Sequence, residues 1–198
     1  MDANEFVNRV FQNLPAGPIT RFEFKSWRSG DRPTSEGFGL GPVPGADPDK
    51  LIARVMDVDR YVGNVDYVAE CRSVADPNYV RPQKVRFYQR IGLPVLGDIQ
   101  MELALVDLGV RDGWRVAAWS QIDDATRRLD PKRGARSAYN VGCWLVKPGI
   151  VGYALSSAPA KEDVGMLKYA AMTKGADASA PQVVKANIEG MARWASRS

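Results

Sequence analysis

The side chains with the clearest chemical potential alternate along residues 84–91. Arg86, Tyr88 and Arg90 share one face of an extended chain there, because successive side chains of a strand point to opposite sides. If that face points inward, the arginine fork suits a carboxylate or a phosphate group. If it points outward, both arginines are solvated, which is the more frequent arrangement for arginine. A shift of one residue would exchange the two arrangements, so the sequence leaves both open.

Any enzyme built from this chain must work without histidine, which is absent from all 198 residues. This excludes Ser-His-Asp and Cys-His catalysis and removes the commonest general base and transition-metal ligand. Cys71 and Cys143 fall within expected strands, and two cysteines alone cannot build a standard zinc site, so we expect buried free thiols. We therefore predict no catalytic motif, no metal site and no cofactor. A non-enzymatic role is favoured, and an enzyme is left open.

Composition and charge restrict the partners. Hydrophobic residues make up 45% of the chain, enough for a substantial core, and the net charge is only +4. The densest basic cluster comprises Arg127, Arg128, Lys132, Arg133 and Arg136, and we interpret it as a solvated hairpin tip rather than a contact with an anionic surface. No recognition motif accompanies it, so we predict no nucleic-acid partner. The acidic N-terminus and the absence of a long apolar run predict a cytoplasmic protein.

Hydrophobic periodicity predicts an α+β chain. We expect a helix over residues 4–14, strands over 19–27 and 35–43, and a helix that Asp47 caps and Pro48 opens. From residue 67 the period changes from 3.6 to 2, which is typical of an antiparallel meander. Its expected strands span residues 67–74, 84–91, 98–108, 114–122, 137–146, 150–156 and 166–174.

Glycine recurs at every second position in Gly37-Phe38-Gly39-Leu40-Gly41. The segment lacks the third spaced glycine and the following helix of a phosphate-binding loop, so we discount that function. We predict instead an edge strand that a helix or ligand approaches closely.

The chain closes with an amphipathic helix expected over residues 180–196. Ser179 is the expected N-cap, and Pro181 would lie in the first turn, where a missing N–H costs little. Val184, Ile188 and Met191 form its apolar stripe. Laid on a large curved sheet, such a helix can act as a lid over a cavity.

Three stretches together resemble the START-like (SRPBCC, helix-grip) superfamily of lipid and polyketide ligand-binding domains. They are residues 47–61, residues 85–98 and the segment 134–148 with its Gly-x-Arg and Trp144. The lead-in to the last helix, residues 174–181, departs from the family pattern, as does Ile99-Gln100. The resemblance implies a curved antiparallel sheet wrapped around a long C-terminal helix. It also implies a single domain over residues 1–198, with an N-terminal helix extension at 1–18 and a lid helix at 180–197.

Such a fold usually offers an apolar pocket to a ligand. We expect Ile99, Met101, Leu103 and Leu105 to point inward, and Trp119 rather than Trp114 to do so. For each apolar residue ordinary core packing is the alternative. The predicted ligand-binding residues are Arg86, Tyr88, Met101, Leu103, Trp119, Tyr139, Val184, Ile188 and Met191.

The function favoured on these grounds is binding, and possibly transfer, of a lipid or another largely apolar small molecule. Loops at residues 93–96 and 158–163 would gate the pocket, and Leu93, Val95 and Leu96 would make transient membrane contact. One alternative is an enzyme similar to polyketide aromatases and cyclases, with Tyr88, Arg86 and Tyr139 stabilising an enolate. The other is an interaction module with no cavity.

Overall fold

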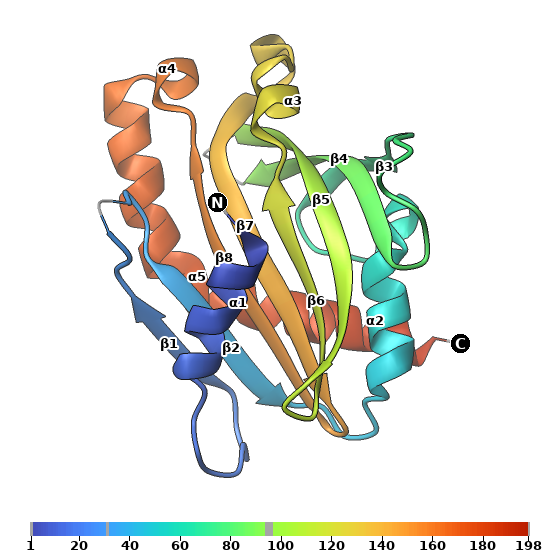
Figure 1. Ribbon diagram of the computed structural model, residues 1–198. Coiled ribbons are helices and arrows are strands. Elements are labelled where there is room, and N and C mark those ends of the chain that lie inside the picture. The colour runs from blue at the N-terminus through green and yellow to red at the C-terminus, as the bar shows by residue number, and fades with distance from the viewer. Residues whose placement is uncertain (1, 31, 94–96, 198) are drawn as a thin grey trace.

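One curved sheet with helices on both faces organises the protein (Figure 1). The computed structural model describes residues 2–30, 32–93 and 97–197. The helices are α1 (Ala3–Gln12), α2 (Pro48–Met56), α3 (Asp123–Arg127), α4 (Lys161–Val164) and α5 (Met166–Ser196). The strands are β1 (Glu23–Trp27), β2 (Glu36–Pro42), β3 (Val68–Ser73), β4 (Lys84–Leu93), β5 (Gly97–Arg111), β6 (Trp114–Gln121), β7 (Ala135–Lys147) and β8 (Ile150–Pro159). The expected α+β class is confirmed, and so is the expected curved antiparallel sheet with a long C-terminal helix.

The sheet has eight strands in the order β1-β2-β8-β7-β6-β5-β4-β3. Neighbouring strands are antiparallel, and a short parallel pairing joins β5 to β7 beyond the end of β6. The meander from β3 to β8 follows the sequence expectation closely. The glycine-rich strand is β2, which pairs with β1 on one side and with β8 on the other. The prediction that it is an edge strand is therefore wrong. Its predicted close approach is confirmed, since a Cβ atom on Gly39 would lie 2.6 Å from Cγ1 of Val184.

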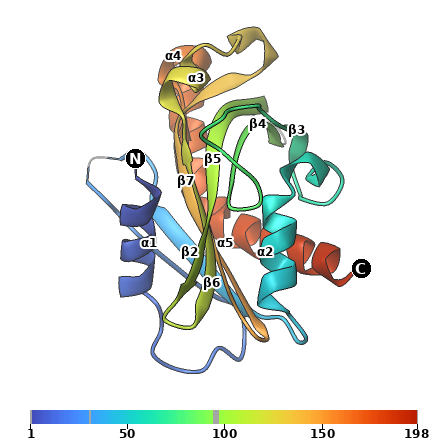
Figure 2. The ribbon, with the colours of Figure 1, turned by 45° about the vertical axis from the view of Figure 1, so that its right-hand side comes forward.

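Alternation along the strands separates two hydrophobic cores, one on each face (Figure 2). The concave core lies between the sheet, α2 and the last part of α5, and includes Leu51, Leu103 and Trp119. The convex core lies under α1 and includes Phe6 and Leu145. Trp114 belongs to the convex core and Trp119 to the concave core, as expected.

The C-terminal helix is longer than the sequence predicts. The expected strand over residues 166–174 is wrong, because these residues form the first turns of α5. Ser179 is therefore not an N-cap, and Pro181 lies inside the helix rather than in its first turn. The early turns are largely exposed and carry little apolar periodicity. Because proline is common in the first turn of a helix, Pro181 led to the prediction that the helix begins there.

The helix α5 changes direction along its length (Figure 1). Its first part descends beside the sheet, and its last part crosses the concave face. Pro181 has no N–H to donate to the carbonyl of Asp177, and Ser179 Oγ donates to the carbonyl of Gly175 at 2.9 Å. Both features favour bending of a helix.

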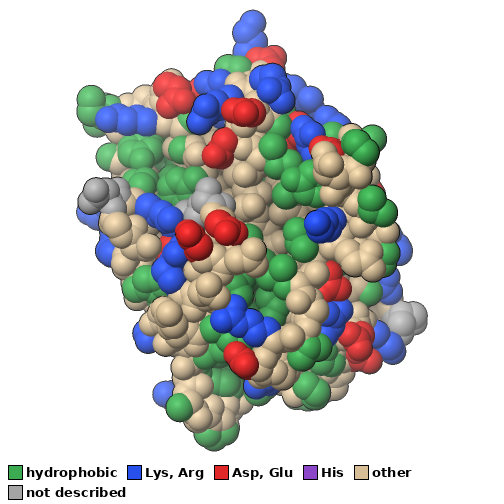
Figure 3. Space-filling model, viewed as in Figure 1, with side chains coloured by type: hydrophobic (Ala, Val, Ile, Leu, Met, Phe, Trp, Pro, Cys, Tyr) green, Lys and Arg blue, Asp and Glu red, His purple; other side chains and the backbone are tan. Residues whose placement is uncertain are grey.

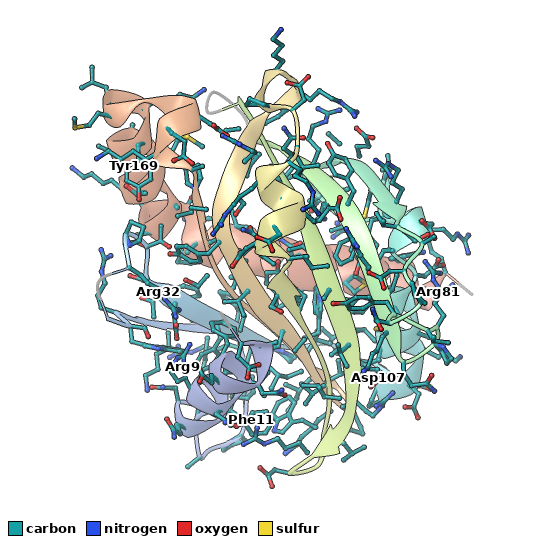
Figure 4. The ribbon with its side chains drawn as sticks, turned by 45° about the horizontal axis from the view of Figure 1, so that its top comes forward. Arg9, Phe11, Arg32, Arg81, Asp107 and Tyr169 are labelled. Atoms are coloured by element: carbon teal, nitrogen blue, oxygen red, sulfur yellow. The ribbon has the colours of Figure 1, made fainter. Side chains whose placement is uncertain are left out.

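A buried carboxylate attaches α1 to the convex face. Glu36 is fully buried and accepts hydrogen bonds from Arg9 Nε and Nη2, at 2.8 and 2.9 Å. Trp27 Nε1 donates to it at 3.0 Å, and Arg32 donates to its other oxygen. Arg9 comes from α1 and Arg32 from the β1–β2 loop, and both approach this side of the sheet (Figure 4). The hydrogen bond with Glu36 raises the pKa of Arg9.

Candidate ligand-binding site

A pocket of about 240 Å³ lies between the concave face of the sheet and α5. The sheet contributes Phe87, Met101, Leu103, Trp119 and Trp144 to its lining. The helix contributes Met172, Val183, Val184, Asn187 and Met191. The lining is therefore mostly apolar, as in small-molecule sites generally, and the volume lies just below their usual range of about 300–1,000 Å³. A second depression of about 450 Å³ lies on the other face beside the start of α1, without any contribution from α5.

Three aromatic rings build one wall of the pocket. Tyr153 stacks on Trp119 with ring centroids 5.5 Å apart, and its centroid lies 4.5 Å from that of Trp144. Gly142 makes room for this group, since a Cβ atom there would lie 2.1 Å from Cζ2 of Trp119. The same Cβ atom would lie 2.4 Å from the carbonyl oxygen of Ala154, which cannot move aside easily. The wall thus depends on a glycine at this position of β7.

A short hydrogen-bonded chain crosses the sheet at the pocket. Trp119 Nε1 donates to Asn140 Oδ1 at 2.6 Å, and Asn140 Nδ2 donates to Met101 Sδ at 3.2 Å. Because an indole N–H can only donate, the contact fixes which end of the Asn140 amide faces Trp119. These two hydrogen bonds through Asn140 hold Trp119 and Met101 in place on the adjoining strands β6 and β5.

Two other polar groups face the pocket without such a partner. The side chains of Gln89 and Tyr153 both line it, both residues are 9% exposed, and neither side chain has a hydrogen-bond partner among the described residues. Burial raises the pKa of the Tyr153 hydroxyl, which keeps it protonated as a donor near neutral pH. These two groups are available to a ligand.

The charged residues of the pocket lining are both acidic. Asp177 accepts hydrogen bonds from the backbone N–H of Ser35 and from Arg28 Nη2, each at 2.9 Å. Asp66 is exposed, and its carboxylate lies 4.0 Å from Arg193 Nη2. Among the described lining residues there is no lysine or arginine.

The predicted site residues fall into three groups. Met101, Leu103, Trp119, Val184 and Met191 line the pocket. Ile188 is buried in the same core without lining the pocket. Arg86, Tyr88 and Tyr139 do not line it, because they occupy the opposite faces of β4 and β7.

The two arginines of β4 have acidic partners on that outer face. Arg86 donates to Asp76 at 2.9 Å and to Glu102 at 2.6 Å, and these hydrogen bonds raise its pKa. Arg90 pairs with Asp98 and lies 3.5 Å from Glu70. The open question of strand phase is thus answered in favour of the outer face, where the arginines are paired rather than simply solvated.

The two predicted tyrosines are engaged elsewhere in the structure. Tyr88 donates to Gln100 Oε1 at 3.2 Å, and its ring lies 5.0 and 5.9 Å from the guanidinium carbons of Arg72 and Arg133. The hydroxyl of Tyr139 is 2.5 Å from that of Thr34. Neither tyrosine is among the residues that line the pocket.

Of the two loops predicted to gate the pocket, one lies largely outside the described residues and the other partly lines the pocket. Residues 94–96 lie outside the described residues, and so does the side chain of Leu93. In the other segment, Ala158 and Pro159 line the pocket. Asp163 accepts three hydrogen bonds from Arg136, at 2.5, 2.7 and 2.8 Å, which attach α4 to the start of β7.

Three pocket residues were not predicted from the sequence, namely Gln89, Trp144 and Tyr153. Alternation offered a signal for Gln89, because it shares a face with the apolar residues Val85, Phe87 and Ile91. In the described part of the chain no three His, Cys, Asp or Glu side chains cluster as a metal site would require. No described helix combines the length and hydrophobicity needed to cross a membrane.

Comparison with known proteins identifies the fold. No protein-family model matches the chain, and no curated protein matches it significantly. The STAR-related lipid transfer protein from Xanthomonas axonopodis superposes with a TM-score of 0.72, at 13% identity, over 92% of this chain and 97% of that one. Human STARD10 gives a TM-score of 0.66 at 13% identity, over 98% and 81% of the two chains. The di-domain ARO/CYC protein BexL gives 0.52 at 11% identity, over 88% of this chain and 50% of that one. The chain therefore has the START-like helix-grip fold that the sequence motifs predicted.

Proposed function

We propose that this protein binds a lipid or another largely apolar small molecule in the pocket between the sheet and α5. The observation that carries the proposal is the pocket itself, which is mostly apolar and lined by both the sheet and the helix. The START-like fold supports it, since the structural neighbour from Xanthomonas axonopodis is named as a STAR-related lipid transfer protein. The proposal treats residues 1–198 as one START-like domain, with the last part of α5 as its lid.

Transfer of the bound molecule is the finer part of the proposal. It requires that the ligand leave and re-enter the pocket, and the first part of α5 is the element best suited to move. That part is largely exposed, whereas Val184, Ile188 and Met191 in the last part are buried in the core.

Extraction and mass spectrometry of the purified protein test the binding proposal. We expect an apolar compound to be extracted from the wild-type protein in stoichiometric amount. Val183→Trp, which fills the pocket from the helix, is expected to abolish its retention. Lys185→Trp, on the exposed side of the same helix, is the matched control and is expected to retain it. A wild-type protein that is consistently empty and that binds no added apolar compound would contradict the proposal.

We propose transient membrane contact at the end of the molecule where α4 meets α5. Met166 and Leu167 are 72% and 91% exposed there, next to the exposed Lys161 and Lys168. Figure 3 shows hydrophobic side chains on the surface over the start of α5. Such a combination suits the surface of an anionic bilayer.

Co-sedimentation with vesicles of phosphatidylcholine and phosphatidylserine tests this contact. Replacing Met166 and Leu167 with serine is expected to lower the bound fraction several-fold. Val110→Ser is the control. Val110 is 68% exposed but lies near the end of β5, whereas the start of α5 lies near Gly97 at the beginning of that strand. Equal binding of both variants and the wild type would contradict the proposed surface.

The two alternatives receive less support. The enzyme hypothesis relied on Tyr88, Arg86 and Tyr139, none of which lines the pocket. The interaction-module hypothesis required a filled space under the last helix, whereas a pocket lies there. The cytoplasmic location expected from the sequence stays a prediction.

A further inference from the structure

The two unpaired polar groups of the pocket are the starting point. Gln89 stands on β4 between Phe87 and Ile91, which line the same pocket, and it is as deeply buried as Tyr153. The amide atoms of Gln89 face the pocket and are not among the fully enclosed polar atoms of the described residues. An amide that lacks a protein partner costs up to about 1–3 kcal/mol where it is also shielded from water. A leucine at position 89 would avoid that cost in this apolar surrounding. The position of Gln89 is therefore explained by a partner that enters the pocket.

The cross-strand register gives Gln89 a polar neighbourhood. Gln89 lies directly opposite Met101 on β5, and Asn140 donates one N–H to the sulfur of Met101 at 3.2 Å. The second N–H of Asn140 has no partner among the described residues. Amide groups thus flank Met101, and Gln89 offers both a donor and an acceptor.

The charges exclude ionic ligands on physical grounds. No described residue of the lining carries a positive charge, so an anionic head group would be buried without a counter-ion. Asp66 and Asp177 would repel it further. Both carboxylates already have arginine partners, which weakens them as counter-ions for a cationic head group.

We propose that the pocket selects an uncharged amphiphile, and that the Gln89 carboxamide binds its hydroxyl or carbonyl oxygen. The Tyr153 hydroxyl is a second donor to the same class of ligand. This inference rests on the proposed binding function and adds the chemical class of the ligand. Gln89 is then a specificity-determining residue that contributes little to apolar binding itself.

Isothermal titration with four compounds of equal chain length tests the class. Octan-1-ol, 1-chlorooctane, octanoate and octylammonium differ only in their polar end. At pH 8 we expect octan-1-ol to bind about tenfold more tightly than 1-chlorooctane, the value of roughly one neutral hydrogen bond. Octanoate is expected to bind at least about 100-fold more weakly than octan-1-ol, because its charge would be buried unpaired. Octylammonium is also expected to bind more weakly than the alcohol.

Variants assign the preference to residues. Gln89→Leu conserves size and is expected to weaken octan-1-ol binding about tenfold, while 1-chlorooctane binding changes less than about twofold. Adding Tyr153→Phe removes the second unpaired group and is expected to abolish any remaining preference for the alcohol. Gln83→Leu, an exposed position just before β4, is the matched control and should behave as the wild type.

The outcomes separate this inference from the proposed function. If octanoate or octylammonium binds as tightly as the alcohol, the neutral class is wrong. If the double variant still prefers the alcohol over the chloride, the assignment to Gln89 and Tyr153 is wrong, although the binding function stands. If none of the four compounds binds to the wild-type protein, the proposed function fails and this inference with it.

Discussion

The two faces of the same sheet are packed in different ways. On the convex face α1 covers small and medium side chains of β6, β7 and β8, among them Ala118, Cys143 and Ala154. On the concave face large rings such as Trp119 and Trp144 stand between the sheet and the helices, and a pocket remains among them. The short helix α1 packs closely on the convex side except at the depression beside its start, whereas the bent α5 spans the hollow side and leaves a pocket beneath it.

Buried polar groups differ in the same way. Glu36 on the convex side is surrounded by donors from Arg9, Trp27 and Arg32. Gln89 and Tyr153 on the concave side have no partner among the described residues. Buried polar groups are normally paired within the protein. The contrast shows that the convex face satisfies its buried carboxylate within the chain, whereas the concave face leaves two polar groups open to the pocket.

The largest expected effect compares two leucines on the two faces. Leu145→Ala, in the convex core, is expected to lower the free energy of unfolding by about 4 kcal/mol, because a closely packed site cannot collapse around the lost atoms. Leu103→Ala is expected to cost about 2 kcal/mol, since Leu103 is buried but borders the pocket, where surrounding side chains can shift into the lost volume. Urea unfolding measures both. Equal losses would contradict the difference in packing.

The next effect concerns the carboxylate that fastens α1. Glu36→Ala is expected to lower the free energy of unfolding by about 3 kcal/mol, because it leaves the Arg9 and Arg32 donors without their acceptor. Both arginines retain contact with water, which keeps the loss at the low end for a buried pair. Glu189→Ala, in an exposed pair with Lys185, is the control and should change stability by less than about 0.5 kcal/mol. If Glu36→Ala lowered the free energy of unfolding by as little as the control, the packing of α1 on the convex face would not depend on Glu36.

A smaller effect is expected where α4 joins the sheet. Hydrogen bonds from Arg136 lower the pKa of Asp163 below its ordinary value, which is about 3.9 in an unfolded chain. Asp163 therefore contributes stability above about pH 4, and this contribution is lost as the pH falls through its folded-state pKa. Asp163→Asn is expected to lower the free energy of unfolding by about 1–2 kcal/mol at pH 7 and by less at pH 3. A loss that is independent of pH would contradict a role for the charge.

The smallest effect has the opposite sign. Gln89→Leu is expected to raise the free energy of unfolding of the ligand-free protein by about 1 kcal/mol, because it removes an unpaired polar group from the pocket. The same substitution is expected to lower affinity for the proposed neutral ligand, so stability and binding would change in opposite directions. Thermal unfolding of the delipidated protein measures the first effect. A loss of stability would indicate that Gln89 has a partner within the protein.

Much of the fold was predictable because its signals are local. Alternation in residues 98–108 placed Met101 and Leu103 on the concave face, and Asp47 capped α2 as expected, accepting from the N–H groups of Asp49 and Lys50. The start of α5 was not predictable in this way. Of residues 166–174 only Met172 is buried, so there is no apolar stripe to indicate a helix.

The site was predictable only in its apolar part. The phase of β4 depends on its pairing with β5, which places Arg86 opposite Ala104 and Gln89 opposite Met101. Alternation groups Gln89 with Val85, Phe87 and Ile91, but only the pairing shows which face of β4 points to the pocket. Tyr153 became a pocket residue through its stacking with Trp119, which requires the β7–β8 register and Gly142.

The bend in α5 also separates two parts of this helix that differ in how readily they unfold locally. The turns after Pro181 are anchored by Val184, Met191 and Trp194, so exposing their amides requires disruption of the concave core. The turns before it are held by few buried side chains, chiefly Met172 and the contacts of Asp177. Local opening free energies follow buried contact, so amide hydrogens in residues 167–176 should exchange with solvent well before those in 184–194. Under the proposed binding function, exchange of the ligand would therefore require opening only the weaker half of one helix, while the sheet stays folded.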